Sequence, residues 1–148
     1  MGRKEAREIA LHLVFELSFK QFSEDELLSD RLEKSVMDSL AGDIALYAGE
    51  LPEEQKLYIR NTVVGVCAHY VELDAMVAAH STNWNTNRLT HMTMSVLRLA
   101  LYEMKYAEDV PVATAINEAV ELAKKYESKE AASFVNGVLG AVAREKAE

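Results

Sequence analysis

Residues 96–139 read VLRLALYEMKYAEDVPVATAINEAVELAKKYESKEAASFVNGVL, and this stretch decides the fold class of the chain. Apolar residues recur along it every three or four positions, which is the pattern of amphipathic helices. Pro111 interrupts the pattern once, and Ser128 marks a second interruption. The stretch predicts three consecutive helices, and it contains no metal-ligand spacing, nucleophile with a base or glycine-rich phosphate loop. These features favour a binding module over an enzyme.

Helical periodicity also dominates the rest of the chain, where no alternating strand pattern flanked by turn dipeptides occurs. A third helix beginning near Pro52 is apolar over so much of its circumference that we expect it at the centre of the fold. Short loops between helices favour packing of near neighbours. The sequence therefore predicts an all-α fold, a compact helical bundle of five to seven helices. The expected helices cover about residues 3–22, 23–42, 52–80 and 87–107, with two more from Pro111 and Ser128.

The composition is that of an ordinary globular protein. A chain of 148 residues is expected to form one domain over 1–148 and to bury about two-thirds of its unfolded surface. Cys67 is the single cysteine, so no intramolecular disulfide can form, which fits the reducing cytoplasm. The charged N-terminus does not resemble a secretory signal, and no run of 18 apolar residues predicts a membrane span.

The net charge of −8 is confined to one segment. Residues 23–54 hold ten acidic and two basic side chains, whereas the remaining residues hold fourteen of each. A pI near 5 would argue against nucleic-acid binding, because phosphate contacts need clustered cations. The neutral remainder of the chain can still carry a local basic face.

Three cations at the start of the first expected helix are candidates for nucleic-acid contact. Arg7 follows Arg3 by four residues and Lys4 by three, which places Arg3 and Arg7, or Lys4 and Arg7, on one side of a helix. They could hold two or three phosphates. The alternative is an ordinary solvated face, although cations at a helix N-terminus oppose the helix dipole and so favour a functional reason.

Other chemistry-bearing residues have stronger structural interpretations. Glu103 falls on the inward stripe of its helix without a histidine or second acid at a useful spacing, so we expect a hydrogen-bonded core carboxylate. The four histidines show no i,i+4 pair, and neither a metal site nor a cofactor is predicted. Phe134 could stack on a base, but core packing is the default for an aromatic residue at its position.

Several segments resemble the family of the transcription antitermination factor NusB. They are VLRLALYEM at 96–104, VPVATAINEAVELAKKY at 110–126 and FVNGVL at 134–139, together with AREIALHLVFEL at 6–17. The resemblance covers nearly the whole chain and is weakest over residues 23–54. The same fold occurs as the N-terminal domain of some RNA methyltransferases, and we expect no catalytic domain here.

The resemblance implies a non-catalytic, cytoplasmic RNA-binding protein. Family members bind boxA-type RNA of ribosomal RNA leaders together with NusE, a small-subunit ribosomal protein, in a complex that keeps RNA polymerase elongating through terminators. A compact helical domain cannot read the deep groove of duplex RNA, so we expect single-stranded RNA as the target. The implied RNA-binding residues are Arg3, Lys4, Arg7, Glu130, Ser133 and Phe134, and the implied NusE-facing residues are Phe15 and Thr93.

The chain departs from the family pattern at four positions. Glu5 interrupts an arm that is usually richer in arginine, and Glu127 replaces a usual glycine. Thr93 stands where an acid is common, and Met94 where a cation is frequent. Fewer cations predict weaker RNA binding by the protein alone and a shallower salt dependence, with tighter binding when the partner is present.

Two functional hypotheses follow from the sequence. The first is an antitermination factor that binds RNA and NusE. The second is a helical protein–protein interaction module whose acidic segment 23–54 is the working surface, without specific RNA binding. The family includes monomers and dimers, so the sequence leaves a homodimer open.

Overall fold

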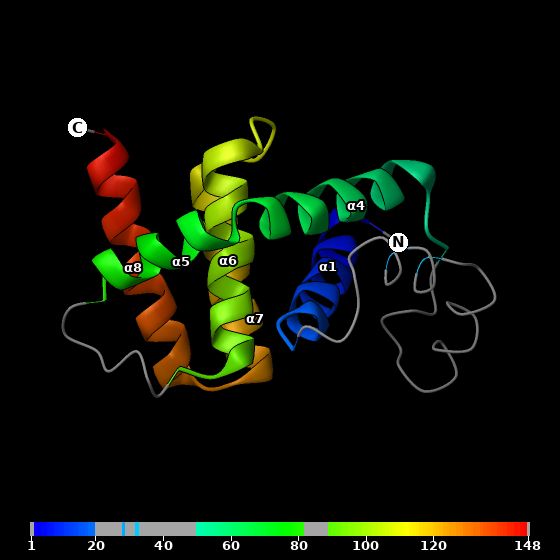
Figure 1. The fold of residues 1–148 in the computed structure, drawn as a ribbon. Helices are drawn as coiled ribbons and strands as arrows, with labels where there is room; N and C mark the ends of the chain where they lie inside the picture. Colours follow the sequence, from blue (N-terminus) through cyan, green and yellow to red (C-terminus); the bar gives the residue numbers. More distant parts are fainter. Residues whose placement is uncertain (1, 20–27, 29–31, 33–49, 82–88, 148) are drawn as a thin grey trace. The chain divides into compact units, whose positions relative to one another are not determined.

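The computed structural model describes residues 2–19, 28, 32, 50–81 and 89–147 (Figure 1). In this part of the chain every regular element is an α-helix, which confirms the all-α prediction with five to seven helices. Most of the acidic segment 23–54 lies outside the described residues, and so does the helix expected over 23–42 apart from Leu28 and Leu32. The helices are α1 (Arg3–Leu17), α4 (Glu53–Ala68), α5 (Tyr70–Ala79), α6 (His91–Tyr106), α7 (Val112–Tyr126) and α8 (Lys129–Ala147).

The chain divides into two compact units, Met1–Cys67 and Ala68–Glu148. The first contains α1 and all of α4 except its last residue, and the second contains α5 to α8. The expectation of a single domain over 1–148 stays a prediction. Among the described residues no single helix is long and apolar enough to cross a membrane, and α4 and α5 meet that criterion only as a bent pair, by length and composition alone.

In the first unit, the helical periodicity of residues 3–22 predicts one apolar stripe on α1, made of Ala6, Ile9, Ala10, Leu13, Val14 and Leu17. Its spacing of three and four residues places these side chains on one face of the helix. Most of the predicted stripe is fully buried, whereas Leu17, at the last position of the helix, is only partly buried. The buried members of the stripe are Ala6, Ile9, Ala10, Leu13 and Val14.

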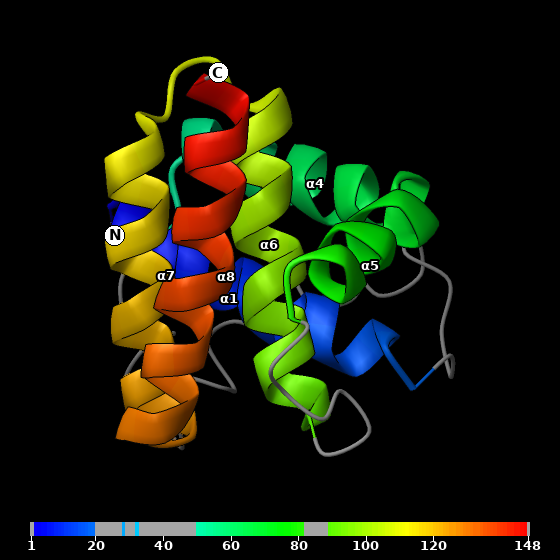
Figure 2. The same cartoon turned by 90° about the vertical axis from the view of Figure 1, so that its left-hand side faces the viewer.

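In the second unit, α6, α7 and α8 contact one another, and α5 packs on α6 (Figure 2). The starts of these helices follow local chemistry. Pro111 precedes α7, where its missing N–H costs nothing. Ser128 accepts a hydrogen bond from the Ala131 N–H at 3.0 Å, which confirms it as the N-cap of α8. The Thr90 hydroxyl oxygen accepts from the Thr93 N–H at 3.0 Å and caps α6 in the same way.

The long helix predicted from Pro52 to about His80 is wrong, because it is broken at His69 into α4 and α5. The His69 ring stacks on Tyr106 with centroids 4.2 Å apart, and its Nδ1 lies 3.3 Å from a carboxylate oxygen of Glu72. Apolar periodicity continues across the break, so it could not reveal a turn that is stabilised by a residue of α6.

The apolar residues that recur at intervals of seven along this region are on the outside. Leu57 is 58% exposed, Val71 is 81% exposed, and Val64 and Ala78 are exposed as well. The expectation that this helix is central was therefore wrong for that stripe. The buried stripe consists of the neighbouring residues Ile59, Val63 and Val66 on α4 and Leu73 and Val77 on α5.

A buried arginine joins α5 to α6. Arg98 donates from Nε to Asp74 at 2.7 Å and from its terminal nitrogen to the second Asp74 oxygen at 3.1 Å. The same terminal nitrogen donates to the Tyr70 hydroxyl at 2.8 Å. A two-point guanidinium–carboxylate pair fixes orientation as well as distance. The pair therefore sets how α5 lies on α6 within the second unit.

Candidate nucleic-acid interface

The first two turns of α1 carry the three predicted phosphate-binding cations. Glu5, at the third helical position, accepts a hydrogen bond from the Gly2 N–H at 3.1 Å. A carboxylate here also complements the positive end of the helix dipole. Glu5, which interrupts the basic arm in the sequence, therefore has a structural task at the start of the helix.

Arg3 and Arg7 lie one helical turn apart and both approach the ring of Tyr58 on α4. The guanidinium carbon of Arg3 is 4.2 Å from the ring centroid, and that of Arg7 is 5.9 Å away. Both distances fall within the range of cation–π attraction. Arg3 also donates from Nε to Gln55 at 2.9 Å and lies 3.8 Å from Glu54. The structure thus brings two of the predicted residues together around one aromatic side chain.

The three cations differ in what they can offer to a ligand. Lys4 is exposed, and the side chain of Arg3 is 30% exposed. Arg7 is only 5% exposed and therefore presents little surface. Charge and spacing in the sequence do not distinguish these three residues. Their burial separates one outward lysine, one partly shielded arginine and one arginine that belongs to the packed part of the first unit.

The second predicted region lies in the first two turns of α8. Glu130 and Ser133 are exposed, and their spacing of three residues places them on one face. Phe134 is one position further round the helix and is only 2% exposed. Its ring therefore has no open face for stacking on a base. This aromatic residue packs in the core, as its periodicity favoured.

Gly137 extends the exposed face of α8 by one more turn. A Cβ atom added at this glycine would meet nothing within 4 Å. A glycine inside an exposed helix costs roughly 1 kcal/mol relative to alanine. The fold does not require glycine at position 137, because a side chain would meet no crowding and the backbone φ is not positive.

The two predicted partner-facing residues also differ in exposure. Phe15 is partly buried, and its ring meets that of Phe19 edge-on with centroids 5.2 Å apart. Thr93 is 3% exposed, and its hydroxyl lies 3.1 Å from that of Thr90 at the cap of α6. Thr90 in turn donates to Glu127 at 2.6 Å. Thr93 is thus part of a hydrogen-bonded junction between α6 and the end of α7.

No catalytic arrangement emerges from the described residues. Glu103 is 1% exposed, and every buried side-chain nitrogen and oxygen in the described part has a hydrogen-bond partner. Glu103 is therefore a satisfied core carboxylate, as the sequence favoured. In the same part, no three histidine, cysteine, aspartate or glutamate side chains gather as they would around a metal ion.

Sequence reasoning missed the residues of α4 that hold the arginines. Tyr58 and Gln55 contact Arg3 across more than fifty positions of sequence. In the sequence Tyr58 looks like one more apolar residue of an amphipathic helix. Its position one turn after two glutamates, Glu53 and Glu54, could have suggested a partner for basic side chains.

Comparisons with known proteins agree with this fold. The sequence model of the NusB family matches residues 4–144. The transcription antitermination protein NusB of Acetivibrio thermocellus is 37% identical over 146 residues, covering 99% of this chain and 91% of that protein. The corresponding protein of Listeria monocytogenes is 35% identical over 145 residues, covering 98% of each.

Solved structures of NusB proteins share this fold. The structure of T. maritima NusB aligns with a TM-score of 0.79 at 25% identity, covering 98% of this chain and 92% of that one. A crystal structure of antitermination factors NusB and NusE in complex with dsRNA aligns with a TM-score of 0.76 at 24% identity, covering 97% and 96%, which shows a shared fold. Because the family's sequence model and these relatives span nearly its whole length, the chain belongs to the NusB family.

Proposed function

We propose that this protein is a non-catalytic transcription antitermination factor that binds boxA-type RNA together with NusE. Family membership supports the antitermination role. A relative of the same fold has been crystallised with NusE and dsRNA, which supports RNA and NusE as partners. The observation that carries the proposal is the cluster of cations at the start of α1, where Arg3 and Arg7 are held against Tyr58 beside the exposed Lys4.

In this proposal, the start of α1 contacts the phosphates. Lys4 extends into solvent and can meet a phosphate directly, while Tyr58 restricts the side chain of Arg3 before RNA arrives. A restrained side chain loses less conformational freedom on binding. Arg7, buried beside the same ring, raises the local positive potential and supports the position of Arg3.

The exposed face of α8 reads the bases. The Glu130 carboxylate can accept hydrogen bonds from base amino groups, and the Ser133 hydroxyl can both donate and accept. Phe134 supports this face from the core instead of stacking on RNA. Contacts to base edges supply sequence preference, whereas phosphate contacts supply most of the affinity.

Two residues are proposed to serve the partner contact, Phe15 on α1 of the first unit and Thr93 at the start of α6 in the second unit. Because Thr93 is buried, its contribution is to hold the first turn of α6 in place for the partner. In the cell, the protein acts in the cytoplasm as part of the RNA polymerase antitermination complex. A homodimer that covers the RNA surface would compete with this assembly, and light scattering at two concentrations tests for it.

A filter-binding titration tests the RNA function. The probes are a boxA-like single strand, a scrambled strand and a duplex of the same sequence, each with and without NusE. We expect preference for the boxA-like single strand and tighter binding with NusE. Lys4→Glu should weaken RNA binding about tenfold and reduce the slope of log affinity against log salt by roughly 0.7, the value for one lost single-strand contact.

Arg60→Glu is the matched control, because it makes the same change of charge at an exposed site on α4. If Lys4→Glu and Arg60→Glu weaken RNA binding equally, Lys4 acts only through the overall charge of the protein and does not contact a phosphate. Equal affinity for boxA-like and scrambled RNA, with NusE present, would contradict the proposal and favour the protein–protein module instead.

A further inference from the structure

The second unit contains a pocket between α5, α6 and α8, apart from every residue proposed to meet RNA or NusE. Its volume is about 350 Å³, within the range of small-molecule sites. Ligand sites of this kind combine apolar walls with a few convergent polar groups. Four apolar and four ionisable side chains line it: Met76, Leu101, Met104, Val142, His80, Lys105, Glu145 and Lys146.

The walls suit a flexible apolar ligand. Leu101 and Val142 are buried and form a fixed part of the wall. Met76 and Met104 supply the rest, and the unbranched, polarizable side chain of methionine adapts to ligands of different shape. An alkyl or aryl group entering the pocket would leave water for apolar surface, which is favourable in proportion to the area buried.

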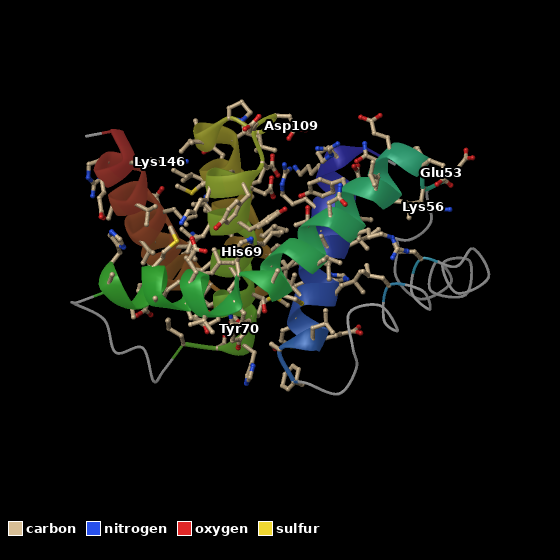
Figure 3. The ribbon with its side chains drawn as sticks, turned by 45° about the horizontal axis from the view of Figure 1, so that its top comes forward. Glu53, Lys56, His69, Tyr70, Asp109 and Lys146 are labelled. Carbon is tan, nitrogen blue, oxygen red and sulfur yellow. The ribbon has the colours of Figure 1, made fainter. Side chains whose placement is uncertain are left out.

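The ionisable residues of the pocket are mostly cationic. Lys146, near the C-terminal end of α8 (Figure 3), donates to the Met104 carbonyl oxygen at 2.9 Å. Lys105 pairs with Glu72, and the hydrogen bond to that carboxylate raises the pKa of Lys105, so it stays charged. Glu145 is the single acid in the lining, and it contacts His80.

His80 adds a third positive charge when it is protonated. Its Nδ1 lies 2.8 Å from the Met76 carbonyl oxygen, and its Nε2 contacts the Glu145 carboxylate. Both partners can only accept, so both contacts together require the imidazolium form. The Met76 carbonyl first, and then Glu145, raise the pKa of His80.

We propose that this pocket binds a small amphipathic carboxylate, with its apolar chain between the two methionines and its carboxylate at Lys105 and Lys146. Charge complementarity favours an anion, because the two lysines and protonated His80 carry three positive charges, against the two negative charges of Glu145 in the lining and Glu72 beside Lys105. The carboxylate oxygens would accept from the lysine ammonium groups alongside their present partners. Binding of such a ligand would be independent of RNA binding.

Methyl NMR on the full-length protein labelled at its methionine methyl groups tests the proposal. Met76 and Met104 report from the pocket, and Met92 and Met94 are internal references on the opening turn of α6. Titration with octanoate should shift the two pocket signals in a saturable way and leave the two references unchanged. Octylammonium, with the same chain and the opposite charge, should bind about tenfold more weakly.

Variants at the exposed lysines separate charge from packing. Lys105→Gln and Lys146→Gln should each weaken octanoate binding about two- to fivefold, the usual effect of one exposed ion pair. Lys124→Gln, an exposed lysine of α7 outside the pocket, is the control and should leave binding unchanged. Equal binding of octanoate and octylammonium would overturn the proposal, as would shifts of equal size at Met92 and Met94.

Discussion

The starts of α1 and of α8 each carry residues that we propose to contact RNA, and the two regions are built in opposite ways. In α1 the charged residues are partly taken into the structure, with Arg3 and Arg7 held on Tyr58. In α8 the polar residues Glu130 and Ser133 are exposed, and the aromatic residue is the buried one. The comparison teaches that residue type alone does not tell which side chains are available to a ligand.

The largest expected effect concerns the aromatic residue of α8. Phe134→Ala should lower the free energy of unfolding by about 3–5 kcal/mol, because it removes a fully buried ring and leaves a cavity. Its exposed neighbour Ser133→Ala should change stability by no more than about 0.5 kcal/mol. Urea unfolding followed by circular dichroism measures both. Similar stabilities for the two variants would show that Phe134 is not a core residue in solution.

Gly137→Ala sharpens the contrast on the exposed face of α8. The variant should be more stable by roughly 1 kcal/mol, since alanine favours the helix and its Cβ meets nothing. If RNA approaches this face closely, the same methyl group should weaken RNA binding in the filter assay. Gly140→Ala is the control, with a Cβ 3.4 Å from the Arg144 guanidinium. Equal RNA affinity of both variants and wild type would remove Gly137 from the proposed surface.

A smaller effect is expected at the start of α1. Arg3→Gln should cost about 0.5–1 kcal/mol of stability, because it removes the cation–π contact with Tyr58 and the bond to Gln55. Lys4→Gln should leave stability nearly unchanged, since Lys4 is exposed. Thermal unfolding of the two variants, which lose the same charge, provides the comparison. Identical melting temperatures would mean that Tyr58 does not hold Arg3.

The smallest effect depends on pH and lies at the other end of α8. The pKa of His80 is raised in the folded state, so its contribution to stability is complete below about pH 6.5, the unfolded value, and disappears as pH rises through the folded value. The Met76 carbonyl of α5 and Glu145 of α8 contact this histidine, and Lys105 of α6 and Lys146 of α8 line the same pocket.

His80→Gln cannot titrate and isolates this contribution. Wild type should exceed the variant in stability more at about pH 5.5 than at about pH 8.5, measured by urea unfolding at both values. An equal difference at the two pH values would show that the imidazolium is not held between Met76 and Glu145. His80→Gln should not change RNA binding by the residues at the starts of α1 and α8.

The sequence predicted the helices well where local signals exist. Pro111 and Ser128 marked the starts of α7 and α8, and periodicity predicted the buried stripe of α1 and the core position of Phe134 on α8. Both signals act over one or two turns, so they are readable in a single sequence. The expected end of the first helix at Phe22 was about one turn too late, since α1 ends at Leu17.

What the sequence could not predict depends on residues distant along the chain. The break at His69 is stabilised by Tyr106, and the burial of Arg7 accompanies its approach to Tyr58. Thr93 reads as a surface residue in the family pattern, but it is enclosed at the cap of α6 beside Thr90. Each of these outcomes is a tertiary contact, which periodicity and residue type do not encode.

The final turn of α8 is anchored from two sides, through Glu145 on His80 and Lys146 on the Met104 carbonyl. The ends of most helices fray, and chain termini usually tolerate shortening. Here, removing residues 145–148 would strip the end of α5 of its acidic contact and leave a carbonyl in the last turn of α6 to water. Shortened versions of this protein should therefore lose the anchoring of α8 to α5 and to α6 at the same time.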